Sequence, residues 1–306
     1  MRLFKYLSPE RIDVLKNQCV RFTQAKYLND PFEWLPFVNR LMSELASKDF
    51  YQNNLKPTIK EILNRKPTIN DIPEEYRSRI PKEMLDEVFK CTIGEALQLL
   101  PQFHPENLTK ILLSRTSEQL NINISELLKK SWNKHFGVLS LTQSHDNIPM
   151  WSHYSKNHEG FVIEFDPKNI FFTSTKKDAG LNRYLKEVEY TPERRNINLF
   201  ESGDTEFDIL NRIASEIFFT KSIHWSDERE VRVVDKLSNY SKAINNQEIY
   251  LFDFEPKALI AIYYGVNISD STKSDINSII NTSYPHVKRY SGQLDLKQYK
   301  INFHEE

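Results

Sequence analysis

The sequence has few of the residues and patterns that identify the commonest nucleotide-binding and secreted classes. Glycine occurs 7 times in 306 residues, and neither GxGxxG nor GxxxxGK[ST] is present. This argues against the common dinucleotide-binding fold and against a P-loop. Two cysteines, Cys19 and Cys91, are too few for a disulfide framework and lack metal-ligand spacing. We expect both to be reduced and packed.

Long apolar runs and a strong net charge are also missing. No stretch approaches the ~20 apolar residues of a membrane span. The first residues, MRLFKYLSPER, lack the apolar run of a signal peptide. We therefore expect a cytoplasmic protein without membrane association. A net charge of −1 gives no global electrostatic footprint for nucleic acid, although it leaves room for a local basic patch.

Hydrophobic periodicity predicts an α+β chain with a mixed or mostly antiparallel sheet. Strand patterns lie near both ends of the chain, whereas residues 51–135 have helical periodicity and are punctuated by proline. We therefore predict an α+β catalytic-type core from residues 1–50 and 136–306. Residues 51–135 would form a large helical insertion or subdomain.

The stretch NDPFEW begins with local helix signals. Asp30 can be an N-cap, Pro31 the first helical residue and Glu33 the reciprocal partner of a capping box. Apolar residues then recur at helical spacing. This pattern predicts a helix from Phe32 to about Lys48.

The stretch HWSDEREVRVV carries charges at every second position: Glu228, Glu230 and Arg232. Alternate strand residues share a face, so these three should project together while Val231 and Val233 face the other way. Adjacent carboxylates repel unless a cation lies between them, and Arg232 can supply it. The pattern fits either an ion-pair ladder on a sheet surface or the floor of a polar site.

The loop predicted for residues 144–159 is rich in histidine and aromatic residues. The spacing of His145, His153 and His158 matches no common metal motif, so we predict no metal site. Trp151 and Tyr154 can pin the loop, or His153 and Tyr154 can belong to a ligand pocket.

The stretch LSLTQ predicts a strand with Ser140 and Thr142 on one face. These side chains either form a half-exposed polar face or donate hydrogen bonds to a ligand. NDPFE, MWSHY and WSDERE are distant in sequence, and one shared cleft would explain all three. We predict that one concavity is lined by Asn29, Asp30, Trp151, His153, Tyr154, Glu228 and Glu230.

Four stretches carry a family resemblance: FKYLS, FTQAKYLNDPFE, LSLTQSHDNIPMWSHYSKNHEGFVIEFD and KSIHWSDEREVR. They resemble the motifs of a large bacterial family of unknown function. Its members show Asn-Asp-Pro-Phe-Glu, Met-Trp-Ser-His-Tyr followed by His-x-Gly, and Trp-x-x-Glu-x-Glu-x-Arg. The resemblance spans residues 3 to about 265. Relatives occur in mobile elements and phage-defence neighbourhoods, which implies a defence or toxin-type role.

A remoter resemblance is to the ADP-ribosyltransferase fold, which implies NAD as a substrate. That superfamily has a basic or histidine residue on an early strand, then a Ser/Thr-rich strand, then Glu-x-Glu. The matching positions here are Lys5 or Tyr6 (or Arg21), Ser140-Leu141-Thr142 and Glu228-x-Glu230. The chain departs from the pattern because no Arg or His occupies the first strand position and a leucine interrupts the second element.

By this resemblance, Glu230 would hold the nicotinamide ribose and stabilise an oxocarbenium-like state, while Glu228 would orient or deprotonate the acceptor. We count His153 with them as a catalytic candidate. The candidate NAD-binding residues are Lys5, Tyr6, Asn29, Asp30, Ser140, Thr142, Trp151 and Tyr154.

Two other functions remain open on the sequence. The aromatic surplus and the helical insertion suit a non-catalytic sensor or interaction module that binds a partner protein of a defence system. The histidine loop and nearby acids would suit a metal-dependent nuclease. If the chain is a transferase, its acceptor is a protein or a nucleic acid.

Overall fold

The computed structural model describes residues 1–42, 49–71, 82, 85–86, 89–98, 118–173, 183–205, 209, 212, 214–244 and 248–306. The chain forms two compact units. The first comprises residues 1–37, 123–195 and 210–306, and the second comprises 38–122 and 196–209. Compared with the division drawn from the sequence, residues 38–50 and 196–209 group with the second unit and residues 123–135 with the first.

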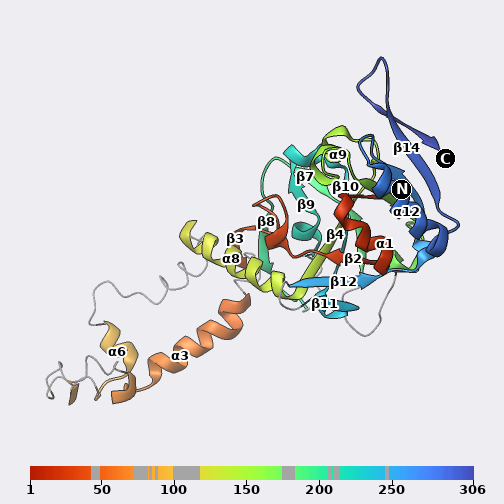
Figure 1. Cartoon of the computed structure of the whole chain (residues 1–306). Helices are drawn as coiled ribbons and strands as arrows, with labels where there is room; N and C mark the ends of the chain where they lie inside the picture. The colour runs from red at the N-terminus through yellow and green to blue at the C-terminus, as the bar shows by residue number, and fades with distance from the viewer. Residues whose placement is uncertain are drawn as a thin grey trace. The chain divides into compact units, whose positions relative to one another are not determined.

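The first unit is built on an eight-stranded sheet, in which Figure 1 labels strands β4, β10 and β14. The strand order is β15-β14-β13-β5-β1-β4-β10-β6. All neighbouring strands are antiparallel except β13 and β14. The predicted α+β class with a mostly antiparallel sheet is therefore confirmed. The strands are β1 (Leu3–Leu7), β4 (Phe136–Thr142), β5 (Phe161–Phe165), β6 (Tyr184–Glu187), β10 (Glu230–Lys236), β13 (Leu259–Tyr264), β14 (Lys288–Leu294) and β15 (Ile301–Glu305).

Helix α12 (Asp270–Ser283) provides the crossover between the parallel strands β13 and β14. The Ser269 hydroxyl caps this helix by accepting a hydrogen bond from the Thr272 N–H at 3.1 Å. Ile276 and Ile280, four residues apart and therefore on one helix face, are buried in the main core. The sequence thus specifies both where the helix begins and which face it buries.

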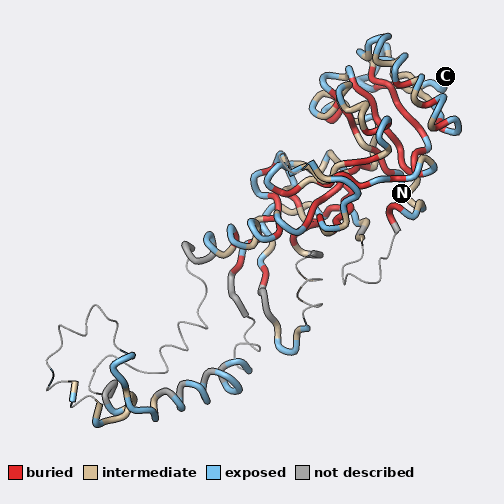
Figure 2. Tube along the Cα trace, turned by 60° about the horizontal axis from the view of Figure 1, so that its bottom comes forward, coloured by how far each residue is buried: buried red, intermediate tan, exposed pale blue. Residues whose placement is uncertain are grey.

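The central strands are buried on both faces, as the red segments of Figure 2 show. In β10, Val231 and Val233 pack into the main core, and Glu230 and Arg232 alternate with them. A second apolar cluster, which contains Phe4, Tyr6 and Trp151, packs around β1 and helix α9 (Ile148–Tyr154). The charges of β10 therefore lie inside the protein and do not form a ladder on its surface.

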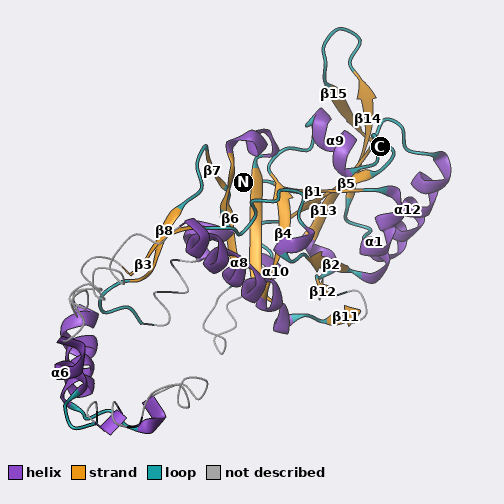
Figure 3. Cartoon of the chain, turned by 90° about the vertical axis from the view of Figure 1, so that its left-hand side faces the viewer, coloured by secondary structure: helices purple, strands orange, loops and turns teal. Residues whose placement is uncertain are grey.

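Smaller elements surround this sheet in the first unit (Figure 3). Strands β11 (Lys242–Ile244), β12 (Ile249–Asp253) and β2 (Cys19–Phe22) form a three-stranded sheet, and β7 (Glu189–Thr191) pairs in parallel with β9 (Thr220–Ser222). The helices are α1 (Asp13–Asn17), α8 (Glu118–His135), whose last thirteen residues belong to this unit, and α10 (Ile170–Thr173). Cys19 and Cys91 do not form a disulfide, and Cys19 is buried.

The described part of the second unit contains α3 (Lys56–Asn64), α6 (Ile93–Gln98) and the paired strands β3 (Phe37–Met42) and β8 (Asn196–Phe200). Thr92 and Glu95 form a capping box at the start of α6. A Cβ on Gly94 would lie 3.1 Å from the Leu63 carbonyl oxygen, so glycine permits the close approach of α6 to α3.

The helix predicted from Phe32 to Lys48 is wrong in its described part. The Asp30 carboxylate accepts from the Phe32 N–H at 2.9 Å, but the chain makes only one turn. Trp34 adopts a left-handed backbone (φ 54°), and Pro36 follows. A left-handed residue ends a helix, and proline disfavours the helical conformation of the residue before it. Strand β3 follows, and residues 43–48 lie outside the described residues.

Candidate active site

Arg232 is the centre of a charge cluster buried in the first unit. Its side chain is fully buried, and its Nε and Nη2 donate to the two Glu230 oxygens at 2.8 and 3.0 Å. Nη2 also donates to Glu33 Oε1 at 2.5 Å, and Nη1 donates to the Phe218 carbonyl at 2.8 Å. Glu33 and Arg232 are 199 positions apart in the chain, so this contact ties the NDPFE turn to β10.

Lys221 extends this cluster to a third carboxylate. Its Nζ donates to Glu228 Oε2 at 2.6 Å and to Glu230 Oε2 at 3.1 Å, and lies 3.8 Å from Glu33 Oε1. The ammonium also lies over the Trp225 ring, 4.8 Å from its centroid. The cluster thus contains three carboxylates and two cations, which gives a formal charge of −1 when all are ionised.

The electrostatic balance differs from one acid to the next. Burial acts to raise the pKa of Glu230, but the charges of Arg232 and Lys221 outweigh it and hold that pKa well below its ordinary value. Burial dominates at Glu33 and raises its pKa despite Arg232. Burial lowers the pKa of Lys221, but the nearby carboxylates, led by Glu230, reverse this and raise it. Glu230 is therefore held as an anion at neutral pH.

Glu228 reaches the cluster through a turn and not through strand pairing. The turn is a 3₁₀ helix, η6 (Ile223–Glu228), which ends at Arg229 in a left-handed conformation (φ 44°). Strand β10 begins only at Glu230, so the predicted strand alternation holds for Glu230 and Arg232 but not for Glu228. Thr142 fixes the turn because its hydroxyl donates to the Glu228 carbonyl at 2.5 Å.

Helix α9 positions a tyrosine against Glu228. The predicted loop of residues 144–159 contains this helix because Asn147 is its N-cap and accepts from the Met150 N–H at 3.0 Å. Tyr154, at its end, donates its hydroxyl hydrogen to Glu228 Oε1 at 2.6 Å and accepts from Asn29 Nδ2 at 2.6 Å. Burial, followed by the hydrogen bond to Glu228, raises the pKa of Tyr154, so the phenol stays protonated.

The sheet opens between β1 and β4. These strands share one registered pair, Phe4 with Thr142, whereas β1 pairs with β5 over five residues. Across this seam, Lys5 Nζ donates to the Ser140 carbonyl at 3.1 Å. Burial lowers the pKa of Lys5 to about 8, and within the described residues its ammonium has no carboxylate within 4.0 Å.

A cavity of about 240 Å³ lies at this opening, and we call it the seam pocket. It is lined by β1, β4, the Tyr27–Asn29 segment, α9 and the two glutamates of the Glu-x-Glu motif. It brings together eight of the residues selected from the sequence: Lys5, Tyr6, Asn29, Ser140, Thr142, Tyr154, Glu228 and Glu230. Their catalytic and binding roles stay predictions.

Three selected residues do not line the seam pocket. Asp30 caps the turn at Phe32 and lines a separate cavity. Trp151 is fully buried, and its Nε1 donates to the His145 carbonyl at 2.8 Å. His153 is exposed on α9. The predicted single concavity therefore contains Asn29, Tyr154 and both glutamates but not these three. Arg21, the alternative basic residue, also lies outside its lining.

Glu33 and Lys221 were not selected from the sequence, yet both line the seam pocket. The sequence pattern predicts that Glu33 completes a capping box within its own turn. Such a local role gives no indication that its side chain reaches Arg232 on β10. Lys221 precedes the Glu-x-Glu motif by seven positions, and its role depends on the η6 turn folding back. Its position just before a dense acidic stretch was the available signal.

The histidine loop has a packing role in the structure. His145 stacks on Phe4 with ring centroids 5.1 Å apart, and His158 stacks parallel to Trp151 at 6.1 Å. In the described parts of the chain, no group of three His, Cys, Asp or Glu side chains is placed to hold a metal ion. No described helix is long and apolar enough to cross a membrane.

Residues 150–233 match the model of a family described as protein of unknown function, DUF2971. This range includes Tyr154, Lys221, Glu228 and Glu230. Over 139 residues, the chain is 27% identical to a ribosomal protein L11 methyltransferase from Ruminiclostridium cellulolyticum. That match covers 38% of this chain and 44% of the methyltransferase, so the chain spans less than half of the relative's length. No solved structure matches.

Proposed function

We propose that the chain is an NAD-consuming enzyme of the ADP-ribosyltransferase kind, with its active site in the seam pocket. One observation carries the proposal. Five separate segments of the chain line one cavity, which contains Lys5, Tyr154 and Glu228 and lies beside a buried anionic cluster. NAD consumption would account for the defence or toxin-type role that the family resemblance implies.

The reaction breaks the bond between the nicotinamide nitrogen and C1′ of its ribose, and nicotinamide leaves as a neutral molecule. A new bond forms between C1′ and an acceptor oxygen or nitrogen, from a macromolecule or from water, and the acceptor loses a proton to a carboxylate or to solvent. The positive charge that develops on the ribose needs nearby anions in a water-poor site. The net charge of −1 on the buried cluster supplies this.

We assign the reacting carboxylate to Glu228, which reverses the roles implied by the resemblance. Both Glu230 oxygens are already paired with cations, and its side chain is 5% exposed. The Glu228 side chain is 12% exposed, and among the described residues only its Oε2 is paired with a cation, Lys221, because the neutral Tyr154 hydroxyl binds Oε1. Glu230 would then be a positioning residue that keeps Lys221 and, through it, Glu228 in place.

Lys5 would contact the phosphates of the substrate. Its ammonium faces the pocket without a carboxylate partner among the described residues, and such a cation suits an anionic ligand. A volume of about 240 Å³ is below the range of about 300–1,000 Å³ that is typical of pockets for whole ligands. The seam pocket therefore suits part of NAD, the nicotinamide ribose together with the phosphate that Lys5 would contact.

The test is nicotinamide release from NAD by the purified chain, followed by chromatography. We expect Glu228→Gln to lower kcat by about 100-fold or more with little change in KM, because a transition-state charge interaction is lost. The matched control is Glu159→Gln, a change at an exposed surface acid. Thermal unfolding of each variant separates lost chemistry from lost folding.

Full turnover by Glu228→Gln would reject the role given to this residue. No nicotinamide release by the wild type, with water or with bacterial protein and nucleic acid as acceptors, would reject the enzyme and favour the sensor or interaction module. The methyltransferase relative does not support a separate proposal, because the match covers under half of that protein.

A further inference from the structure

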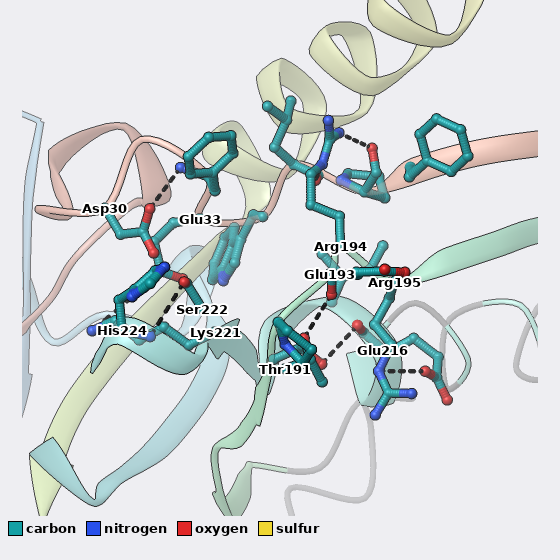
Figure 4. A pocket seen from close by; sticks show the side chains of 18 residues that line it. Asp30, Glu33, Thr191, Glu193, Arg194, Arg195, Glu216, Lys221, Ser222 and His224 are labelled. Carbon is teal, nitrogen blue, oxygen red and sulfur yellow. Dashed lines mark hydrogen bonds and ion pairs between the residues drawn. The ribbon is translucent and has the colours of Figure 1, made fainter. Parts of the chain in front are cut away.

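A second, larger cavity of about 550 Å³ lies in the first unit beside the charge cluster (Figure 4). It is formed by residues 30–37, 191–195 and 216–224 and has mostly apolar walls, including Phe32, Trp34 and Ile217. Glu33 and Lys221 line both this cavity and the seam pocket. The proposed reaction uses none of its other residues.

Three buried polar atoms of residues that line this cavity have no hydrogen-bond partner among the described residues: Glu33 Oε2, Trp34 Nε1 and Arg195 Nε. Arg195 Nε lies 3.7 Å from a Glu216 oxygen and its side chain is 33% exposed, so Glu33 Oε2 and Trp34 Nε1 are the two deeply buried ones. The Glu33 side chain and the whole of Trp34 are each 1% exposed. Buried polar atoms nearly always have hydrogen-bond partners, and an unpaired one is costly. Glu33 Oε2 is an acceptor and Trp34 Nε1 is a donor, and the two residues are adjacent in the lining of one cavity. This pair indicates a ligand that supplies a donor and an acceptor.

The complementary ligand is a flat ring system with a hydrogen-bond donor and an acceptor on its edge. Because Glu33 Oε1 is bound to Arg232, one carboxylate oxygen remains to accept a bond. This favours a single exocyclic amino group over the paired donors of guanine. The Trp34 N–H needs an acceptor, which an adenine ring nitrogen can supply, and the aromatic and proline side chains of the lining suit flat ring faces. We propose that the larger cavity binds the adenine base of an adenosine nucleotide.

Arg194 is placed for the phosphate of that nucleotide. Its Nε donates to the Leu35 carbonyl at 2.9 Å and its Nη2 to the Pro36 carbonyl. The side chain is exposed, and no carboxylate lies within ion-pair distance of it in the described parts of the chain. Figure 4 shows Arg194 across the cavity from Glu33 and Lys221. The base would lie inside, and the phosphate would lie at the rim.

The first test is titration calorimetry of the full chain with adenosine and with purine riboside, which lacks the amino group. Adenosine binds at the site, and purine riboside binds at least about tenfold more weakly, because it leaves the buried Glu33 Oε2 without a hydrogen-bond donor. Because both nucleosides are tested on the same wild-type protein, a difference in affinity cannot arise from a change in folding. Absence of adenosine binding, or equal binding of the two nucleosides, overturns the proposal.

The second test is Trp34→Phe, which removes the N–H and keeps an aromatic ring. Adenosine affinity falls about fivefold, the effect of one neutral hydrogen bond. Trp132→Phe is the matched control, because both indoles pack on Phe218, with ring centroids 5.7 Å apart for Trp132 and 4.4 Å for Trp34, and Trp132 lies outside the cavity lining. An unchanged affinity in Trp34→Phe, or an equal loss in the control, overturns the assignment.

Adenosine can arrive as a separate nucleotide or as half of NAD, and competition separates these sources. AMP that displaces bound NAD identifies the dinucleotide's adenosine as the occupant. AMP that binds together with NAD identifies a separate nucleotide. Both results support the adenine site, and neither requires turnover, so the failure of the proposed reaction is distinguishable from the failure of this site.

Discussion

Arg232→Met tests whether the buried cluster is an interdependent set of charges. The substitution removes the cation that contacts both Glu33 and Glu230 and leaves Lys221 as the one cation within 4.0 Å of them in the described structure. Removing one partner of a buried ion pair costs about 3–5 kcal/mol. The Phe218 carbonyl also loses its donor. We expect the free energy of unfolding to fall by about 4 kcal/mol at pH 8.

The cost should shrink as the pH falls. Without Arg232, burial raises the pKa of Glu230 above its unfolded value and raises further that of Glu33, which is already raised in the wild type. Groups of this kind contribute stability below the unfolded pKa and lose it as the pH rises through the folded pKa. The variant therefore recovers by about 1 kcal/mol or more, relative to wild type, between pH 8 and pH 5. In wild type, Glu230 keeps its charge across this window because its pKa is lowered.

Urea unfolding followed by tryptophan fluorescence provides the measurement, because all four tryptophans lie in the first unit. Wild type and variant are compared at each pH. Replacing Glu33 and Glu230 by glutamine as well should recover at least half of the loss. Arg11→Met, which removes a half-exposed pair, serves as control and should cost under about 1 kcal/mol. A cost below about 1 kcal/mol for Arg232→Met, or one independent of pH, would refute the reasoning.

Three further changes probe separate parts of the site. Lys5 has a pKa of about 8, so its ammonium loses its charge between pH 7 and pH 9. The affinity for inorganic pyrophosphate, measured by calorimetry, should therefore fall over this range in the wild type and stay constant in Lys5→Arg. A constant wild-type affinity would contradict this. Gly160→Ala should lower the free energy of unfolding by about 1–3 kcal/mol, because its Cβ would lie 2.1 Å from the Leu7 carbonyl oxygen; an unchanged urea midpoint would show that the strands adjust freely. Asn147→Ala should cost about 1 kcal/mol by uncapping α9, and Asn147→Asp should restore most of this; equal unfolding curves for the two variants would exclude the capping role.

Local patterns in the sequence identified the strands that carry the site. Alternation placed Glu230 and Arg232 opposite Val231 and Val233, because strand periodicity depends on neighbouring residues alone. The same reasoning located β4 with Ser140. These predictions required no knowledge of which strands pair.

Features that depend on long-range contacts were missed. The NDPFEW signals predicted the start of a long helix, but only one turn forms, and the Glu33 carboxylate binds Arg232, 199 residues away. The strand β3 replaces a predicted helix because the left-handed Trp34 stops propagation, and no local rule forces a tryptophan into that conformation. The opening between β1 and β4 depends on strand order, which a linear pattern does not contain.

The single registered pair between β1 and β4 has a mechanical consequence. In the sheet order, five strands ending with β1 lie on one side of this junction and three beginning with β4 on the other, so one registered pair joins the two groups. A ligand that contacts both Lys5 on β1 and Thr142 on β4 would link the two groups of strands. Its binding would slow hydrogen exchange at the backbone amides of β1 and β4. The strand junction with the fewest registered pairs would then be the part of the sheet that ligand binding stabilises most.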